Sequence, residues 1–251
     1  MIRQAKCEAW GTVLAIAAMV VGASAVQAEP PEGFQSIFNG KDFDGWIVPE
    51  GDNGHWQVVD RVIDYDAESE APGDKSLWTE KEYDDFILQV DWRITATPYI
   101  NPNVPLIKPD GTHKMNENGA EIKMAVPDSD SGILLRGEGT SQVNIWCWPI
   151  GSGEVYGYRM NRNMPAEVRA GVTPKSHADK DIGEWNTFEI TMKGDRLWVK
   201  LNGVEVIENA QLPGIPDRGP LALQHHGGKR DGQWVSPPSL VQFRNLAIKE
   251  L

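Results

Sequence analysis

The stretch Gln142-Val-Asn-Ile-Trp-Cys-Trp148 alternates between two kinds of side chain. Successive side chains of a β-strand point to opposite faces, so this alternation predicts a strand with two unlike faces. The aliphatic or small side chains on one face are Val143, Ile145 and Cys147. The amides and indoles on the other face are Gln142, Asn144, Trp146 and Trp148. We expect the first face to pack into a core and the second to meet a ligand.

A face that pairs two amides with two indoles suits a sugar. Aromatic rings cover the C–H face of a pyranose, and fixed amides exchange hydrogen bonds with its hydroxyl groups. In a two-sheet protein both faces of a central strand can be covered, so the indoles could instead fill a second small core. The segment that follows, Gly151-Ser-Gly-Glu-Val-Tyr-Gly-Tyr158, adds two tyrosines to the region. The predicted substrate-binding residues here are Gln142, Asn144, Trp146, Trp148, Tyr156 and Tyr158.

Arg136 precedes the aromatic stretch, in Asp128-Ser-Asp-Ser-Gly-Ile-Leu-Leu-Arg-Gly137. Strand alternation places it on the side opposite Ile133 and Leu135. There it could bind a sugar oxygen or a carboxylate of the substrate, or it could pair with Asp128 or Asp130. We carry Arg136 forward as a candidate catalytic residue.

The rest of the chain indicates many short strands joined by turns. Residues 86–95 alternate strictly, and Asp60-Arg61 and Asn202-Gly203 are typical of tight hairpins. Residues 98–119, rich in turn formers, are expected to be a long loop at the rim of the site or a lid over it. Residues 161–180 are expected to be irregular, and no helical period is sustained after residue 28. Together these patterns predict an all-β sandwich of two antiparallel sheets.

Residues 1–28 are typical of a secretory signal peptide. Arg3 and Lys6 precede a short apolar run, and Val26-Gln-Ala28 offers small residues for cleavage. The run is too short to span a bilayer, so no stable membrane insertion is expected after cleavage. We expect a periplasmic or secreted protein with a single domain over residues 29–251.

Composition excludes some partners and cross-links. The chain has 251 residues, a formal net charge of −12 and two cysteines. Such acidity makes nucleic acid an unexpected partner. Removal of Cys7 with the signal leaves Cys147 alone, so no internal disulfide is expected. The sequence lacks recognisable metal-ligand spacing and phosphate-binding loops, and we expect neither a metal nor another cofactor.

Several segments carry a resemblance to a known family. They are Asp-Ser-Gly-Ile-Leu-Leu-Arg-Gly137, Gln142-Val-Asn-Ile-Trp146, Gly183-Glu-Trp-Asn186, Gly219-Pro-Leu-Ala-Leu-Gln-His-His-Gly227 and Phe243-Arg-Asn245. From about Phe34 to Leu251 the chain resembles the 3-keto-disaccharide hydrolase domain. The resemblance implies a concanavalin A-like jelly roll and hydrolysis of oxidised glucosides or disaccharides. Much of the family has Glu-Val-Gln-Ile-Leu-Asp where this chain reads Gln142-Val-Asn-Ile-Trp-Cys147, a departure that removes two acidic groups.

Catalytic candidates follow from this resemblance and from strand alternation. In Ala222-Leu-Gln-His-His226, Gln224 and His226 share one side, which resembles the family's sugar-facing one, while His225 points the other way. His226 is therefore the preferred general base and Gln224 a further substrate ligand, although a structural role for either histidine stays open. Glu154 is the carboxylate nearest the aromatic stretch and the alternative base. The acidic residues that we interpret as turn or cap residues are Asp128, Asp130 and Glu184.

The predicted chemistry follows from a ketone at C3 of the sugar. The ketone acidifies the hydrogen on C2, so one base can remove it while an electropositive group, here Arg136, steadies the enolate. The aglycone then leaves C1, and water adds back. The sequence thus predicts an exported enzyme that cleaves 3-keto-glucosides. The alternatives are a non-catalytic carbohydrate-binding module that uses the same aromatic face and an interaction domain without affinity for sugars.

Overall fold

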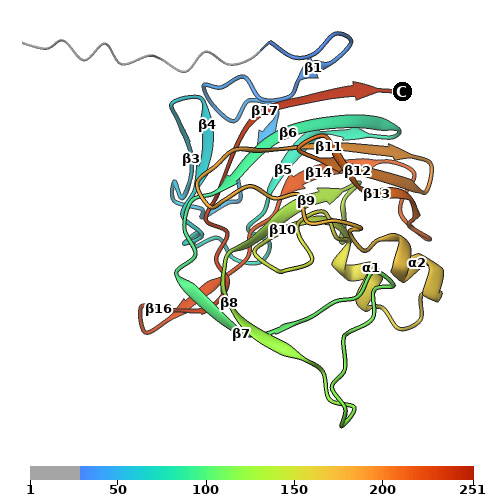
Figure 1. Cartoon of the computed structure of the whole chain (residues 1–251). Helices are drawn as coiled ribbons and strands as arrows, with labels where there is room; N and C mark the ends of the chain where they lie inside the picture. Colours follow the sequence, from blue (N-terminus) through green and yellow to red (C-terminus); the bar gives the residue numbers. More distant parts are fainter. Residues whose placement is uncertain (1–28) are drawn as a thin grey trace, which may run out of the picture.

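Figure 1 shows a computed structural model of the chain, which describes residues 29–251. Two antiparallel sheets pack face to face as a jelly-roll sandwich, so the predicted all-β sandwich is confirmed. The predicted signal peptide, residues 1–28, lies outside the described residues. Among the residues that the structure describes, no helix is long and apolar enough to cross a membrane.

The larger sheet has eight strands and the smaller one has five. Across the larger sheet the order is β13 (Val204–Gln211), β12 (Arg196–Leu201), β11 (Asn186–Lys193), β6 (Phe86–Ile94), β17 (Val241–Glu250), β4 (Val62–Tyr65) and β3 (Trp56–Val59), with β1 (Gln35–Ser36) paired to β17. Across the smaller sheet it is β10 (Glu138–Trp146), β9 (Asp130–Leu135), β14 (Gly219–Leu223), β5 (Leu77–Tyr83) and β2 (Trp46–Ile47).

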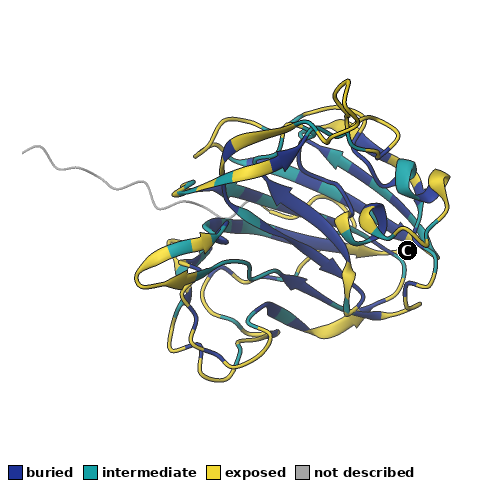
Figure 2. Cartoon of the chain, turned by 90° about the horizontal axis from the view of Figure 1, so that it is seen from below, coloured by how far each residue is buried: buried dark blue, intermediate teal, exposed yellow. Residues whose placement is uncertain are grey.

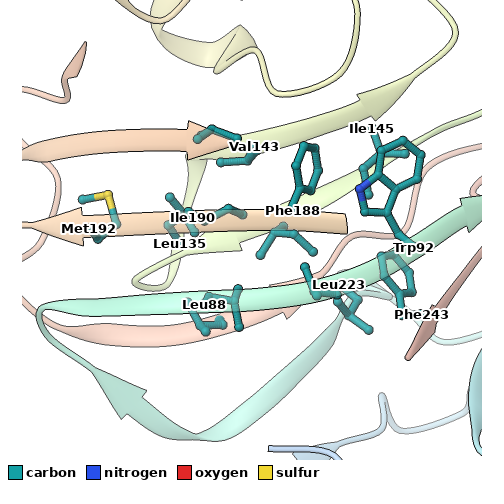
Figure 3. Packing of buried hydrophobic residues seen from close by; sticks show 14 of the residues in the cluster. Leu88, Trp92, Leu135, Val143, Ile145, Phe188, Ile190, Met192, Leu223 and Phe243 are labelled. Atoms are coloured by element: carbon teal, nitrogen blue, oxygen red, sulfur yellow. The ribbon is translucent and has the colours of Figure 1, made fainter. Parts of the chain in front are cut away.

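The core lies between the two sheets. Along β6 every second residue is buried, as the sequence alternation predicts, because each of these side chains points toward the smaller sheet. Figure 3 shows Leu88 and Trp92 of β6 packing among side chains of the facing strands, Val143 and Ile145 of β10 included. In Figure 2 the buried positions follow the middle of the strands, and the exposed ones gather in the hairpins and turns. The apolar face of residues 142–148 is therefore the core face, with Cys147 packed at its margin.

Two hairpins and two short helices lie outside the sheets (Figure 1). They are β7 (Tyr99–Pro105) with β8 (Lys123–Asp128), β15 (Gly228–Arg230) with β16 (Gln233–Ser236), α1 (Tyr156–Met160) and α2 (Ala166–Gly171). The prediction of a long loop at residues 98–119 is wrong for its first part, which forms β7. An isolated bridge between Ile107 and His113 continues the pairing beyond β7. Prolines within β7 hide its period, and β7 pairs only with β8. The helices are too short, at five and six residues, to leave a helical period in the sequence.

Candidate functional site

A cavity of about 380 Å³ lies on the face of the smaller sheet that points away from the core. Its volume is in the range of small-ligand pockets. The predicted site residues that line it are Gln142, Asn144, Trp146, Trp148, Tyr156, Gln224 and His226. The remaining lining residues are Asn101, Asp130 and Pro237. The strand β10, the start of α1, the end of β14 and the two hairpins thus meet around one space.

Three aromatic rings form one wall of the cavity. The indoles of Trp146 and Trp148 are stacked, with ring centroids 4.1 Å apart and planes 2° apart. The ring of Tyr156 stands edge-on to both indoles, at 6.1 and 6.3 Å. Trp146 is only 3% exposed and donates its Nε1 hydrogen to the carbonyl of Gly151, whereas Tyr156 is 40% exposed. The inner indole therefore packs as a support, and a ligand would meet Trp148 and Tyr156.

The amides form the floor of the cavity. Gln142 of β10 donates from Nε2 to the carbonyl of Ser131, at 2.9 Å, and to Oε1 of Gln224. Asn144, only 3% exposed, has a buried Oδ1 without a hydrogen-bond partner among the described residues. A buried polar atom without a partner costs free energy unless a ligand or water satisfies it. The floor therefore offers polar atoms to a ligand rich in hydroxyl groups.

His226 lies just beyond β14 with its ring held in one orientation. Its Nδ1 is 2.6 Å from the carbonyl oxygen of Pro237, and its backbone N–H donates to Oγ of Ser239. A carbonyl oxygen only accepts, so Nδ1 carries the hydrogen and Nε2 keeps a free lone pair. His225 lies on the other side, where its Nδ1 meets the hydroxyl of Tyr65 at 2.7 Å, and burial lowers its pKa to about 4. The side chains of the two adjacent histidines therefore lie on opposite sides of the segment, as strand alternation predicts.

Asp130 is a residue of the cavity that our interpretation as a turn residue missed. It begins β9 and pairs with Trp146 across the strands, so both side chains share the cavity face. Burial raises the pKa of Asp130 to about 7; the neighbouring His226 opposes this rise, and the Asp128 carboxylate adds to it. A carboxyl group that titrates near neutral pH beside a histidine is suited to proton transfer. If the short strand before Gly137 had been paired with the aromatic strand after it, the sequence would have placed Asp130 beside Trp146 on the cavity face.

The raised pKa of Asp130 makes a prediction about stability. A carboxyl group whose pKa is higher in the folded than in the unfolded chain stabilises the fold at low pH, and this contribution is lost as pH rises from about 4 to about 7. The Asp130→Asn variant keeps a neutral side chain at every pH. The free energy of unfolding of Asp130→Asn, relative to that of the wild type, should therefore rise with pH by up to about 1.4 kcal/mol per pH unit in this window.

Urea unfolding of both proteins between pH 4 and pH 8 measures this difference. The exposed Asp60→Asn variant, in the turn between β3 and β4, serves as the matched control and should show no such trend. A constant difference between Asp130→Asn and wild type across the window would contradict the raised pKa.

Asp128 is buried beneath the cavity and is not a turn residue. Its carboxylate accepts hydrogen bonds from Nδ2 of Asn101 and Nε1 of Trp148, both at 3.0 Å, and from the backbone N–H of Cys147. Loss of hydration raises its pKa. The carboxylate thereby fixes the outer indole and the hairpin residue Asn101 at the cavity wall.

The expectation that Arg136 meets the substrate or pairs with Asp128 or Asp130 is wrong. Its guanidinium group is buried and donates to the carbonyl oxygens of Asp84, Gly194 and Pro216, at 2.7 to 3.1 Å, and to the carboxylate of Asp85, at 3.0 Å. The backbone φ of Arg136 is +52°, so the residue leaves the alternation of β9 that the prediction assumed. Arg136 ties three turns together outside the cavity.

Glu154 and Tyr158 also lie outside the cavity. Glu154 is fully buried and forms an ion pair with Arg159 of α1, and burial raises its pKa to about 7. Tyr158 is buried in the core, and its hydroxyl donates to the carbonyl of Pro213. We predicted both residues to be in the site because they are close in sequence to the aromatic strand. The chain turns into α1 here, and both side chains are buried away from the cavity.

Within residues 29–251, no group of three or more histidine, cysteine or acidic side chains is arranged to hold a metal ion. The polar groups that line the cavity are one imidazole, one carboxyl group, four amides and one phenol hydroxyl, from His226, Asp130, Asn101, Gln142, Asn144, Gln224 and Tyr156. These groups can exchange protons and hydrogen bonds with a polar ligand that lies against the aromatic wall.

Comparison with solved structures gives the same fold. Two candidate glycosyl hydrolase structures from Parabacteroides distasonis align with TM-scores of 0.54 and 0.53 at 20% and 22% identity. The alignments cover 88% and 87% of this chain, and 84% and 94% of the other chains. At this identity the likeness shows the fold alone. Comparison with curated proteins finds no significant match.

The family comparison covers nearly all of the described chain. The family described as the 3-keto-alpha-glucoside-1,2-lyase-like domain matches residues 33–249. The match includes both sheets and every residue that lines the cavity. The chain therefore belongs to the 3-keto-alpha-glucoside-1,2-lyase-like domain family.

Proposed function

We propose that this protein cleaves the glycosidic bond of 3-keto-glucosides, with His226 as the base that removes the hydrogen from C2. The observation that carries the proposal is the fixed imidazole. Its Nδ1 is held by the carbonyl of Pro237, which leaves the Nε2 lone pair for the substrate in an aromatic-walled cavity. A direct displacement at C1 would instead need two carboxyl groups flanking the bond, and within residues 29–251 Asp130 is the only acidic residue that lines the cavity.

The reaction proceeds in two balanced stages. In the first, Nε2 of His226 takes the C2 hydrogen as a proton, and the C2–H electron pair forms the enolate with its charge on O3. The enolate collapses, C3=O re-forms, a C1=C2 double bond appears, and the C1–O bond to the aglycone breaks. Asp130, whose pKa is raised to about 7, supplies the proton for the departing oxygen.

The second stage restores the enzyme. The Asp130 carboxylate takes a proton from water as the oxygen of that water bonds to C1, and the protonated His226 returns a proton to C2. The sum of both stages is hydrolysis, and release after the first stage is elimination. The two outcomes differ only in whether the unsaturated sugar leaves before water adds.

The test is incubation of the pure protein with a panel of 3-keto-disaccharides and their 3-hydroxy parents. We expect release of the aglycone from the keto substrates alone. In D₂O, the hydrolysis product should carry deuterium at C2, whereas an elimination product has a C1=C2 double bond and no hydrogen there. A hydrolysis product that keeps its original hydrogen at C2 would contradict proton abstraction, and failure to cleave any keto substrate would contradict the proposed function.

The aromatic wall also favours a second candidate function, a non-catalytic carbohydrate-binding module. Such a module needs the stacked rings and the amides but no base. Binding without turnover by the wild type would favour the module, whereas turnover that the His226→Ala variant loses while it still binds sugar would favour the enzyme.

The Trp148→Ala variant should weaken substrate binding with little effect on turnover at saturation. Its indole covers Trp146 and faces the cavity, so its loss removes the contact surface without touching His226. A lost aromatic contact of about 1–1.4 kcal/mol corresponds to a rise of about fivefold to tenfold in Kd. Titration calorimetry with a non-cleaved sugar measures the change. Trp185→Ala, which removes an indole outside the cavity, is the control and should leave Kd unchanged.

We further infer that residues 29–251 act as one domain in the periplasm or outside the cell. One hydrophobic cluster joins both sheets, which supports a single domain, and the composition of residues 1–28 supports export. Amino-terminal sequencing of the protein recovered from each cell fraction tests the inference, with Glu29 as the expected first residue.

A further inference from the structure

The amide pair Gln142 and Gln224 has its orientation fixed by a backbone carbonyl. The carbonyl of Ser131 can only accept, so the atom of Gln142 that lies 2.9 Å from it must be the donor Nε2. The second hydrogen on that nitrogen goes to Gln224, so the Gln224 atom that receives it must be Oε1. The Nε2 group of Gln224 is thereby turned away from Gln142, and it has no hydrogen-bond partner among the described residues.

Gln224 also has a fixed backbone. Its N–H donates to the carbonyl of Gly132 at 2.9 Å, and its carbonyl accepts from Oγ of Ser131 at 2.9 Å. Two residues further along, the ring of His226 is held by Pro237, and both Gln224 and His226 line the cavity. Gln224 and His226 therefore line one cavity from positions two residues apart, Gln224 with an amide N–H that has no partner among the described residues and His226 with the Nε2 lone pair.

We propose that Nε2 of Gln224 donates a hydrogen bond to the C3 oxygen of a 3-keto sugar and holds the negative charge that develops there. The inference rests on the proposed function and assigns the electrostatic role that Arg136 does not fill. As Nε2 of His226 removes the C2 proton, the C2–H electron pair moves onto O3, and the hydrogen bond from Gln224 strengthens with that charge. A donor held in place before the reaction stabilises such an oxyanion without reorganising.

The Gln224→Glu variant tests this role with a side chain of the same shape. The carboxylate can still accept from Gln142, so the packing of the pair is kept, but an acceptor replaces the donor that faces the sugar. We expect kcat on a 3-keto disaccharide at pH 8 to fall by about 100-fold to 1,000-fold, the usual effect of deleting one such donor. As the pH is lowered toward 5, the carboxyl group takes up a proton and can donate again, so the ratio of wild-type to variant kcat should narrow.

Two further variants separate this role from a structural one. Gln224→Met lacks any donor, so it should show a similar loss of kcat that does not narrow at low pH. Gln35→Glu, on the exposed strand β1, makes the same chemical change away from the cavity and should leave kcat unchanged. Circular dichroism and thermal unfolding establish that each variant is folded.

The outcomes distinguish the inference from the proposed function. If the wild type cleaves 3-keto substrates and the kcat of Gln224→Glu at pH 8 is within threefold of the wild-type value, the role of Gln224 is overturned and the proposed function stands. The same conclusion follows if the Gln224→Met deficit narrows at low pH as much as that of Gln224→Glu. A wild type that cleaves no 3-keto-glucoside, whether or not it binds one, overturns the proposed function, and this inference with it.

Discussion

Replacing His226 with alanine is expected to lower the turnover of a 3-keto disaccharide by about 100-fold to 10,000-fold, the range that general base catalysis contributes. The reason is the Nε2 lone pair of His226, the one histidine among the described residues that line the cavity; the neighbouring His225 faces Tyr65 instead. Initial rates at saturating substrate measure the effect, and sugar binding should persist because the aromatic wall is untouched.

Two comparisons make the His226→Ala result specific. His177→Ala removes an imidazole that is 53% exposed and does not line the cavity, so its turnover should match that of the wild type. Added imidazole should restore part of the turnover of His226→Ala, because a small base can occupy the vacated space. If His226→Ala keeps near wild-type turnover, His226 is not the base, and Asp130 becomes the next residue to replace.

Replacing Arg136 with methionine is expected to lower the free energy of unfolding by about 3–5 kcal/mol, because each buried carbonyl oxygen that loses its donor costs about 1–3 kcal/mol. Arg136 is 1% exposed, and its guanidinium group donates hydrogen bonds to carbonyl oxygens of Asp84, Gly194 and Pro216 and to the carboxylate of Asp85. Methionine fills much of the space but leaves the three carbonyl oxygens without these donors, whereas the Asp85 carboxylate keeps the hydrogen bond from the N–H of Gly194. Urea unfolding followed by tryptophan fluorescence measures the loss.

Arg218→Met is the matched control for this substitution. The Arg218 side chain is 55% exposed and contacts the carbonyl and carboxylate of Glu82, so its loss should change the free energy of unfolding by less than about 0.5 kcal/mol. The folded fraction of Arg136→Met should keep the kcat of the wild type, since Arg136 does not line the cavity. A stable Arg136→Met protein with selectively lost kcat would return Arg136 to the catalytic site.

The sequence by itself determined the sandwich class and much of one cavity face. Alternation between Gln142 and Trp148 placed the amides and indoles on one face and the aliphatic residues on the other, and both faces lie where the alternation predicts. The same parity put Gln224 and His226 on the cavity side and His225 away from it. These inferences succeeded because the period of a strand is local, and burial of one face fixes its register.

Only the tertiary structure decided which charged residues belong to the site. Arg136 turns out of the strand pattern at a positive φ and meets turns near residues 84, 194 and 216, which no local pattern brings together. Glu154 forms an ion pair with Arg159 of a helix too short to show a period. Burial and the Asp128 carboxylate raise the pKa of Asp130 against the opposing effect of His226. Burial and electrostatic partners depend on segments distant along the chain, so a charged side chain's role follows from how those segments pack and not from its neighbours in sequence.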